Sequence, residues 1–394
     1  MKLRRRNYNW WLGIGCVLIV LPMIVGCSGN TQQSNQTSST FLQLLKLQPD
    51  SALSTASTGQ AYILMNDFAK IRDVYGISLP TTGDEQDLDN YLLAMFNADH
   101  SLGTSSPNHL QYVYGSGFSP EYLEKESIRS ANVGYGPTNV DASIESSTGL
   151  GLIGNFNPQA TQTAFKEQTG WPQWAKDDYT TENYQNITIN SWGDVNGNIG
   201  DLLDMLGPPD TDELGRACPL AVTPTNVFYS SSTANIKLMI DTSLGKSTSM
   251  ADDPKYASVA KGLTELGAYS AIISNTTTSD FAPNNPLTDT GIQLQPYLTF
   301  GSGEGKDNEG IYQAVVLVYG DNKSAANNAG ILQTRIDQES FTDGTNTTPW
   351  KQIITDSKIS VEGNMILAKV YDTQPGFLSD VEEFPFRLPL LAHQ

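Results

Sequence analysis

The chain has 394 residues, with 23 basic and 42 acidic side chains and a net charge of −19 at pH 7. This excess of acid argues against a nucleic-acid partner, because binding to a phosphate backbone needs clustered lysine and arginine. It also argues against a body that lies flat on anionic lipid. The chain is longer than most domains that fold around a single hydrophobic core, so we expect two domains.

An export signal is predicted at the N-terminus, where four basic residues among the first six precede an apolar segment from Trp10 to Val25. The segment is interrupted by Pro22, and it is shorter than the roughly 20 apolar residues that span a bilayer. A cleaved leader, residues 1–26, is therefore favoured over a permanent membrane helix.

The leader ends in Ile24, Val25, Gly26 and Cys27, a pattern that resembles the lipobox of bacterial lipoproteins. The resemblance implies diacylglyceryl transfer to the Cys27 thiol, cleavage between Gly26 and Cys27, and acyl chains such as palmitate. Two acyl chains anchor a protein stably in membrane lipid, whereas one is marginal. We therefore expect a protein that is lipid-anchored on the extracytoplasmic side of the cell membrane. A signal-anchor cysteine that is never lipidated is the alternative.

Cleavage before Cys27 would leave 19 basic and 42 acidic residues, a net charge of −23. Two cysteines would remain, Cys27 and Cys218. Because the resemblance commits the first to lipid, we expect no internal disulfide, and Cys218 is interpreted as a small buried apolar residue.

A polar tract follows the lipobox, since Ser28 to Thr40 carry neither a charge nor an apolar side chain. Such a segment cannot bury enough apolar surface to fold. We assign residues 27–58 to the lipidated cysteine and a flexible tether. The tract from Ser28 to Thr40 would span about 20 Å as a random coil.

The first half of the body contains a strand, a helix and a hairpin in that order. The apolar run from Gly149 to Phe156 predicts the strand. Asn157 suits the N-cap of a helix that ends near Gly170. Two alternating runs separated at Asn186 predict the hairpin.

The second half repeats this order. A buried-type strand is predicted from Gly310 to Gly320, and a helix from Asn322 to Glu339. A hairpin is predicted from Ile353 to Tyr371, with its turn at Gly363.

Each copy also has an earlier strand, which begins at Ala61 in the first half and at Ala268 in the second. These elements predict an α+β fold of two related domains, residues 59–245 and 246–394. We expect each domain to be a mostly antiparallel sheet with helices packed on one face.

Between the two halves, the sequence predicts a strand that ends at Tyr229, a helix capped near Ser232 and a second helix that begins near Asp253 and Pro254. The stretch "STSMADDPKYASVAKGL", followed by "GAYSAII", resembles segments of several uncharacterised bacterial lipoprotein families. The resemblance implies alternating strands and helices and assigns no activity.

Motifs for catalysis are scarce. The three histidines, His100, His109 and His393, stand in no zinc-binding spacing, and no GxSxG elbow occurs. The stretch "GSGEGKDNEG", from Gly301 to Gly310, lacks the GKS or GKT ending of a phosphate loop. We expect a mobile hairpin loop there.

A calcium site is the alternative interpretation of one polar segment. Asp194, Asn196 and Asn198 alternate as in calcium loops, but Met205 stands where a bidentate glutamate belongs. An ordinary turn is favoured over a weak calcium site, and no other cofactor is expected.

Aromatic residues offer a candidate ligand-binding surface. Trp171 and Trp174 lie in "GWPQW", and Tyr112 and Tyr114 lie in a segment that contains glycine and serine. Rings beside amide and acidic groups bind sugars or peptides. The favoured alternative is that these rings cover the ends of hydrophobic cores.

Three functions follow from this reading. The favoured one is a membrane-anchored binding or assembly protein of the cell envelope, without catalysis and with an envelope protein as partner. The second is a lipoprotein that captures a small sugar or peptide ligand. The third is an envelope hydrolase that uses a carboxylate pair among Asp177, Asp178, Glu182 and Asp194.

Overall fold

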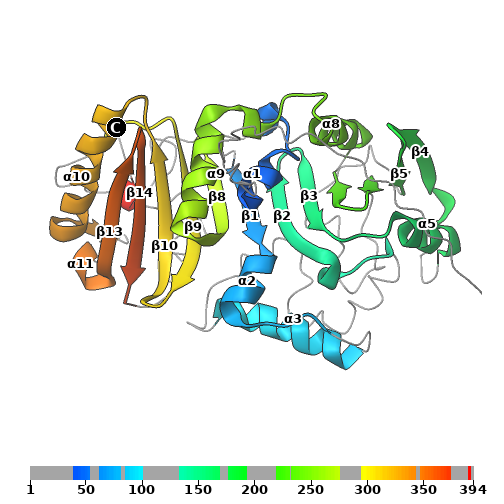
Figure 1. The fold of residues 1–394 in the computed structure, drawn as a ribbon, viewed down its shortest axis with the longest axis horizontal. Coiled ribbons are helices and arrows are strands. Elements are labelled where there is room, and N and C mark those ends of the chain that lie inside the picture. The colour runs from blue at the N-terminus through cyan, green and yellow to red at the C-terminus, as the bar shows by residue number, and fades with distance from the viewer. Residues whose placement is uncertain are drawn as a thin grey trace, which may run out of the picture. The chain divides into compact units, whose positions relative to one another are not determined.

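The computed structural model describes residues 39–53, 62–80, 85–100, 133–168, 176–192, 219–230, 232–275, 294–342, 347–373 and 389–391. Residues Ser38–Gln394 form one compact unit, in which strands and helices alternate along the chain (Figure 1). The described strands are β1 (Tyr62–Asp67), β2 (Val140–Ser146), β3 (Gly149–Gly154), β4 (Thr180–Tyr184), β5 (Ile187–Ser191), β6 (Leu220–Val222), β7 (Asn226–Tyr229), β8 (Ala268–Ser274), β9 (Thr299–Asp307), β10 (Gly310–Val318), β11 (Ser340–Thr342), β12 (Thr347–Pro349), β13 (Ile354–Glu362) and β14 (Met365–Asp372).

The described α-helices are α1 (Thr40–Leu45), α2 (Phe68–Tyr75), α3 (Glu85–His100), α5 (Pro158–Glu167), α8 (Thr233–Ser243), α9 (Pro254–Leu266), α10 (Asn322–Gln338) and α11 (Trp350–Ile353). Short 3₁₀ turns are η1 (Asp50–Leu53), η3 (Pro137–Asn139), η4 (Met250–Asp252) and η6 (Pro389–Leu391). None of the helices in the described ranges is long and apolar enough to cross a membrane.

Twelve of these strands form one sheet, in the order β13-β14-β10-β9-β8-β1-β2-β3-β7-β6-β5-β4. Every neighbouring pair in it is antiparallel. The predicted α+β class with an antiparallel sheet is therefore confirmed. Since β1 pairs with both β2 and β8, the sheet continues from one half of the sequence to the other. The expected boundary at residues 245 and 246 lies between α8 and α9, and it stays a prediction.

The elements of the first half match their predictions. β3 lies in the predicted strand, and Asn157 caps α5 by accepting hydrogen bonds from the backbone of Gln159 and Ala160. The helix ends at Glu167 because Gln168 adopts a left-handed conformation, with φ of 49°. The predicted stop at Gly170 lies outside the described residues.

Turn chemistry explains the two hairpins. Gln185 and Asn186, between β4 and β5, both have positive φ, which two-residue hairpin turns of type I′ require. Gly363 supplies a left-handed residue between β13 and β14. Both hairpins are confirmed where the alternating sequence predicted them.

The tether is shorter than predicted. Within the predicted tether, residues 40–45 form α1 and residues 50–53 form η1, and the side chains of Phe41, Leu44 and Leu45 are buried. Ser39 caps α1 by accepting a hydrogen bond from the amide of Leu42. Burial of these apolar side chains stabilises the segment. The prediction of a tether rested on the polar residues that precede it.

The stretch from Gly301 to Gly310 is not a mobile loop. It forms most of β9, and only Asn308 and Glu309 make the turn into β10. Gly301 faces α9 so closely that a Cβ atom there would lie 2.3 Å from a methyl group of Val259. The glycines thus permit close packing of a helix on the sheet.

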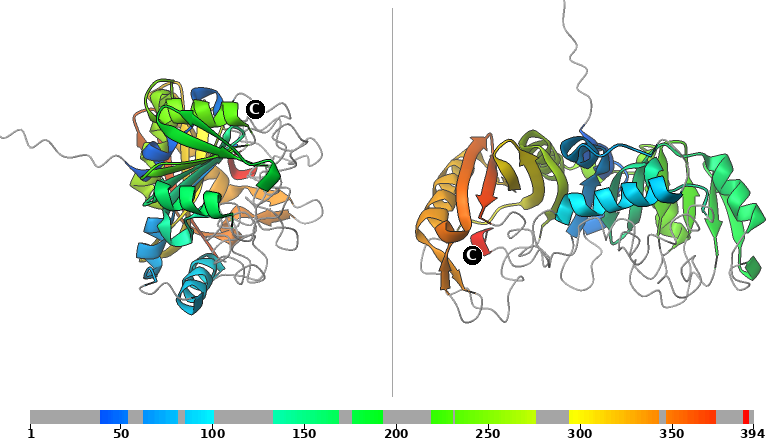
Figure 2. Two further views of the ribbon diagram at one scale, coloured as in Figure 1. Left: turned by 90° about the vertical axis from the view of Figure 1, so that its right-hand side faces the viewer. Right: turned by 90° about the horizontal axis from the view of Figure 1, so that it is seen from below.

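One face of the sheet, the first face, carries a continuous hydrophobic core. The buried side chains of α1, α8 and α9 pack there against strands that run from β5 to β14. The opposite, second face carries two separate cores, one beneath α2, α3 and α5 and one beneath α10 and α11. Helices therefore cover both faces (Figure 2) rather than the single face expected.

Candidate functional site

A band of polar residues separates the two cores of the second face. Strand register places Asn66 of β1 opposite Ser143 of β2 on one side and opposite Ser270 of β8 on the other. Glu304 of β9 lies opposite both Ser270 and Gln313 of β10. Directly paired residues of an antiparallel sheet share one face, so these five side chains form a row across the sheet.

Two further polar residues lie one step along the same face. Glu145 is opposite Leu64, and Ser302 is opposite Ile272. We define the polar strip as these seven residues: Asn66, Ser143, Glu145, Ser270, Ser302, Glu304 and Gln313. All except Glu145, which is half-buried, are at most 5% exposed.

One end of the polar strip is internally hydrogen-bonded. Gln313 donates to the hydroxyl of Ser302 over 2.7 Å. Tyr269 donates to the carboxylate of Glu304, and its hydroxyl lies 3.0 Å from that of Tyr75. Buried polar groups of this kind are normally paired, so this end needs no ligand to satisfy it.

Asn66, at the centre of the polar strip, is different. Its side chain is 0% exposed, and within the described part of the chain neither the oxygen nor the nitrogen of its amide has a hydrogen-bond partner. Leaving a buried polar group unsatisfied costs about 1–3 kcal/mol. The amide thus holds both a donor and an acceptor that the described residues leave unused.

Glu145 is a second polar group whose burial is unfavourable. Burial raises the pKa of its carboxyl to about 7, and no neighbouring charge or hydrogen bond contributes to the shift. Within the described residues, its carboxyl forms no ion pair. A partly desolvated carboxylate is less stable as an anion than one in water.

Leu64 and Ile272 form an apolar floor between these polar groups. They are opposite one another on β1 and β8 and are 5% and 6% exposed, yet neither belongs to a hydrophobic core of the described residues. Apolar surface bordered by a few polar groups is typical of small-molecule sites.

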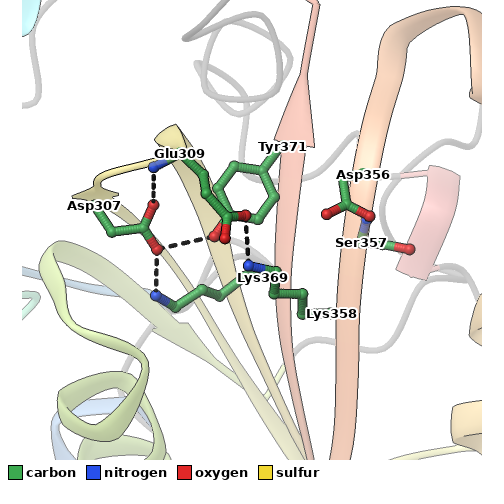
Figure 3. A network of polar contacts seen from close by, with 7 residues as sticks. All are labelled: Asp307, Glu309, Asp356, Ser357, Lys358, Lys369 and Tyr371. Carbon is green, nitrogen blue, oxygen red and sulfur yellow. Dashed lines mark hydrogen bonds and ion pairs between the residues drawn. The ribbon is translucent and has the colours of Figure 1, made fainter.

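A separate polar network, the turn network, ties the β9–β10 turn to β13 and β14 (Figure 3). Asp307 accepts hydrogen bonds from Lys369 over 2.8 Å, from Tyr371 over 2.9 Å and from the backbone of Glu309 over 3.0 Å. Lys358 of β13 forms an ion pair with Glu309. The network holds the turn against the neighbouring strands.

The charges of the turn network are mutually compensated. Burial opposes ionisation of Asp307, but the bonds from Lys369, Glu309 and Tyr371 outweigh it, so the pKa of the Asp307 carboxyl lies below its usual range. The ammonium of Lys369 also lies 4.0 Å from the ring centre of Tyr312. This arrangement is satisfied without a ligand, so we interpret it as structural.

A hollow of about 770 Å³ lies beside the start of α5, lined among others by Tyr135, Leu88 and Glu167. Asn157 already accepts hydrogen bonds from the amides of Gln159 and Ala160 at this helix start. The hollow therefore offers fewer unsatisfied groups than the polar strip.

Most of the sites predicted from the sequence lie outside the described residues: Gly26, Cys27, Tyr112, Tyr114, Trp171, Trp174, Asp194, Asn196 and Asn198. The lipidation site, the aromatic surface and the calcium site accordingly stay predictions. Over the described ranges, no group of three or more histidine, cysteine or acidic side chains is arranged to hold a metal ion.

The acidic cluster is only partly described. Glu182 lies on β4 and forms an ion pair with Lys237 of α8 over 2.6 Å. Asp177 and Asp178 precede β4 and are exposed. The neighbouring Asp194 lies outside the described residues, so the carboxylate pair stays a prediction.

Sequence reasoning missed the polar strip. Its residues stand at alternate positions inside apolar strands, as in "LMN" of β1, "SIE" of β2 and "YSAI" of β8. Each polar residue alone resembles an ordinary exposed strand position. Only the register shows that they are neighbours.

No protein-family model and no curated protein matches the sequence. Among solved structures, the chain is similar to two described as "Structure of crystal form III of TP0453" and "Structure of crystal form I of TP0453". The sequence identities are 10% and 9%, and the TM-scores are 0.34 and 0.33. Each match covers 85% of this chain, and 97% and 96% of the other. Likeness this low supports no conclusion about function.

Proposed function

We propose that the protein is an exported lipoprotein of the cell envelope, held in the membrane through Cys27, and that its folded body binds a small polar ligand at the polar strip without catalysis. The observation that carries the proposal is the amide of Asn66, which is fully buried and has no hydrogen-bond partner among the residues that the structure describes. Because Asn66 is 0% exposed, a ligand supplies the missing partners only when the second face opens around it.

The energetic argument supports binding. An apolar residue at this position would avoid the penalty of about 1–3 kcal/mol for a buried unsatisfied group. Glu145 adds a second unfavourable group on the same face. Groups that lower the stability of the free protein are expected where a bound molecule satisfies them.

A small ligand fits the polar strip better than a protein partner does. Six of its seven side chains are at most 5% exposed, so the broad surface of another protein cannot reach them. Small-molecule sites, in contrast, are recessed and largely apolar with few polar groups. The assembly role with an envelope protein remains the second candidate for the exposed surface.

Two cysteine variants test the anchor. Cys27→Ser should abolish incorporation of labelled fatty acid and release the protein from salt-washed membranes. Cys16→Ser is the matched control, because Cys16 lies within the leader and should leave labelling unchanged. Labelling that persists in Cys27→Ser would refute the anchor.

Thermal melts test the ligand. The full-length chain, purified in detergent, is melted with panels of sugars, amino acids, short peptides and organic amines. A ligand at 100 times its Kd adds about 2.7 kcal/mol of stability, so its melting temperature should rise by several degrees. Asn66→Leu should lose the shift, and Asn327→Leu, an exposed change on α10, should keep it. A panel without any shift would contradict the proposed function.

A further inference from the structure

The hollow beside α5 is lined by three separate parts of the chain: Pro80 with Leu88 of α3, residues 134–139, and one side of α5. Gly134 allows the middle part to pack on the helix, because it has a φ of 79° and a Cβ atom on it would lie 2.5 Å from the backbone nitrogen of Thr161. The volume of about 770 Å³ falls within the range of about 300–1,000 Å³ that small-molecule sites occupy.

Three polar side chains of α5 line the hollow in a row. Gln159, Thr163 and Glu167 are four residues apart, so they lie on the same side of the helix, about 6 Å from one to the next along its axis. All three are exposed, and over the described ranges their side chains form no hydrogen bond or ion pair. A molecule in the hollow can therefore meet an amide, a hydroxyl and a carboxylate over a length of about 12 Å.

Apolar surface accompanies this row. Ala160 and Ala164 of α5 also line the hollow, together with Leu88 and Tyr135. The ring of Tyr135 is held edge to face against that of Phe156, with the ring centres 5.4 Å apart. A fixed ring offers a large contact area and a polar hydroxyl. The lining thus combines apolar contact area with groups that form hydrogen bonds.

The charge of the lining selects among ligands. Its described residues include no lysine, arginine or histidine, and Glu167 is their one charged side chain. A phosphate or carboxylate ligand would find no cation there, and a single exposed carboxylate attracts an amine only weakly. Hydroxyl groups, in contrast, can donate to Glu167 and exchange hydrogen bonds with Gln159 and Thr163. An uncharged molecule with many hydroxyl groups and apolar C–H faces, namely a sugar, matches this pattern.

We infer that the hollow beside α5 binds a short uncharged oligosaccharide, whose hydroxyl groups form hydrogen bonds with Gln159, Thr163 and Glu167. The length of the row favours an oligosaccharide over a single sugar ring. No residue of the polar strip lines the hollow. The inference therefore goes beyond the proposed function and does not depend on it.

Calorimetric titration of the full-length chain, in a detergent without sugar groups, tests the inference. The probes are maltotriose, cellotriose and tri-N-acetylchitotriose. At least one should bind with a Kd of about 1 mM or lower. Its single-ring unit should bind at least tenfold more weakly, because it cannot reach the whole row. The anionic trimer of galacturonic acid should also bind at least tenfold more weakly, because it meets Glu167 and no cation.

Matched variants of exposed α5 residues locate the site. Thr163→Trp places a bulky ring in the middle of the row and should weaken the trimer at least tenfold, and Gln159→Ala should weaken it severalfold. Lys166→Ala is the control, because Lys166 is exposed on the same helix but does not line the hollow. Its affinity should equal that of the wild type. Circular dichroism checks that each variant is folded.

Three results would overturn the inference: no binding by any of the three trimers at about 10 mM, unchanged affinity in Thr163→Trp, or equal affinity for the anionic trimer. None of them bears on the polar strip, which Asn66→Leu tests in the melts. A melting shift with a sugar that survives Asn66→Leu and is lost in Thr163→Trp belongs to the hollow and supports the inference.

Discussion

The two faces of the sheet differ in how far their apolar surface extends. On the first face, one core runs from β5 to β14 beneath α1, α8 and α9. On the second face, the polar strip divides the apolar surface into two cores. The strands are the same on both faces, so the difference arises from alternate residues of each strand. The comparison shows one unbroken core on the first face, whereas the second face, where we propose the binding site, carries two cores divided by polar side chains.

The largest effect is expected at Gly303 of β9, which the backbone of β8 approaches closely. A Cβ atom on Gly303 would lie 2.2 Å from the backbone oxygen of Ser270, which cannot move without separating β8 from β9. Gly303→Ala should lower the free energy of unfolding by about 3 kcal/mol. Gly330→Ala is the control, because nothing lies within 4 Å of its Cβ position on α10. Urea unfolding measures both, and equal stability of the two variants would contradict this account.

Adjacent residues of β1 compare the two faces directly. Met65 faces the first-face core and is 0% exposed, whereas Leu64 lies on the floor of the polar strip. Met65→Ala should cost about 3 kcal/mol, within the usual range for a cavity in a core. Leu64→Ala should cost about half as much, because Leu64 joins no core of the described residues. Chemical unfolding of both variants measures the difference, and a larger loss in Leu64→Ala would reverse the assignment of the faces.

The burial of Glu145 lowers the stability of the folded protein in a pH-dependent way. Its pKa rises from an ordinary value of 4.5 to about 7 through burial, so the folded state holds a proton that the unfolded chain releases between these values. The penalty is absent below pH 4.5, grows as the pH rises to 7 and is complete above it.

Glu145→Gln removes this titration. The variant should match the wild type at pH 4 and be more stable by about 2 kcal/mol at pH 8. The nearest charged residue on β2, Asp141, pairs with Arg72 and is present in both proteins. Unfolding across the pH range measures the difference, and a gap independent of pH would exclude Glu145 as its source.

The smallest effect is expected at the turn network, which is partly exposed. Asp307→Asn should cost about 1 kcal/mol at pH 7, since exposed ion pairs contribute little. The pKa of Asp307 is depressed in the folded state, so its contribution is present above its ordinary pKa of 3.8 and is lost as the pH falls through the folded value. Wild type and variant should therefore converge in acid. A cost that persists in acid would point to lost packing rather than lost charge.

Much of the fold could be predicted because capping and turn residues indicate where helices and strands begin and end. Caps such as Asn157 and Asp253, and the turn at Gln185 and Asn186, mark element ends within a few residues. The alternating hairpins predict an antiparallel sheet. The number of strands in one sheet depends on pairings such as β1 with β8, which join residues far apart in the sequence.

The candidate site could not be predicted for the same reason. Asn66, Ser143 and Ser270 come from three separated strands, and nothing near each residue indicates the other two. The segment of β9 was predicted to be a loop because it is rich in glycine. In the structure, α9 packs against it and it is an extended strand. Tertiary packing decided both cases.

The central claim is that the second face carries an unsatisfied group for the sake of a ligand, and Asn66→Leu tests it most directly. Asn328 is the control, since it is equally buried but accepts a hydrogen bond from the amide of Gln295 and donates one to the carbonyl of Ser324, both over 2.7 Å. By urea unfolding without ligand, Asn66→Leu should be about 1 kcal/mol more stable than wild type, and Asn328→Leu about 2 kcal/mol less stable. A loss of 2 kcal/mol or more in Asn66→Leu would show that its amide supports the fold, and would contradict the claim.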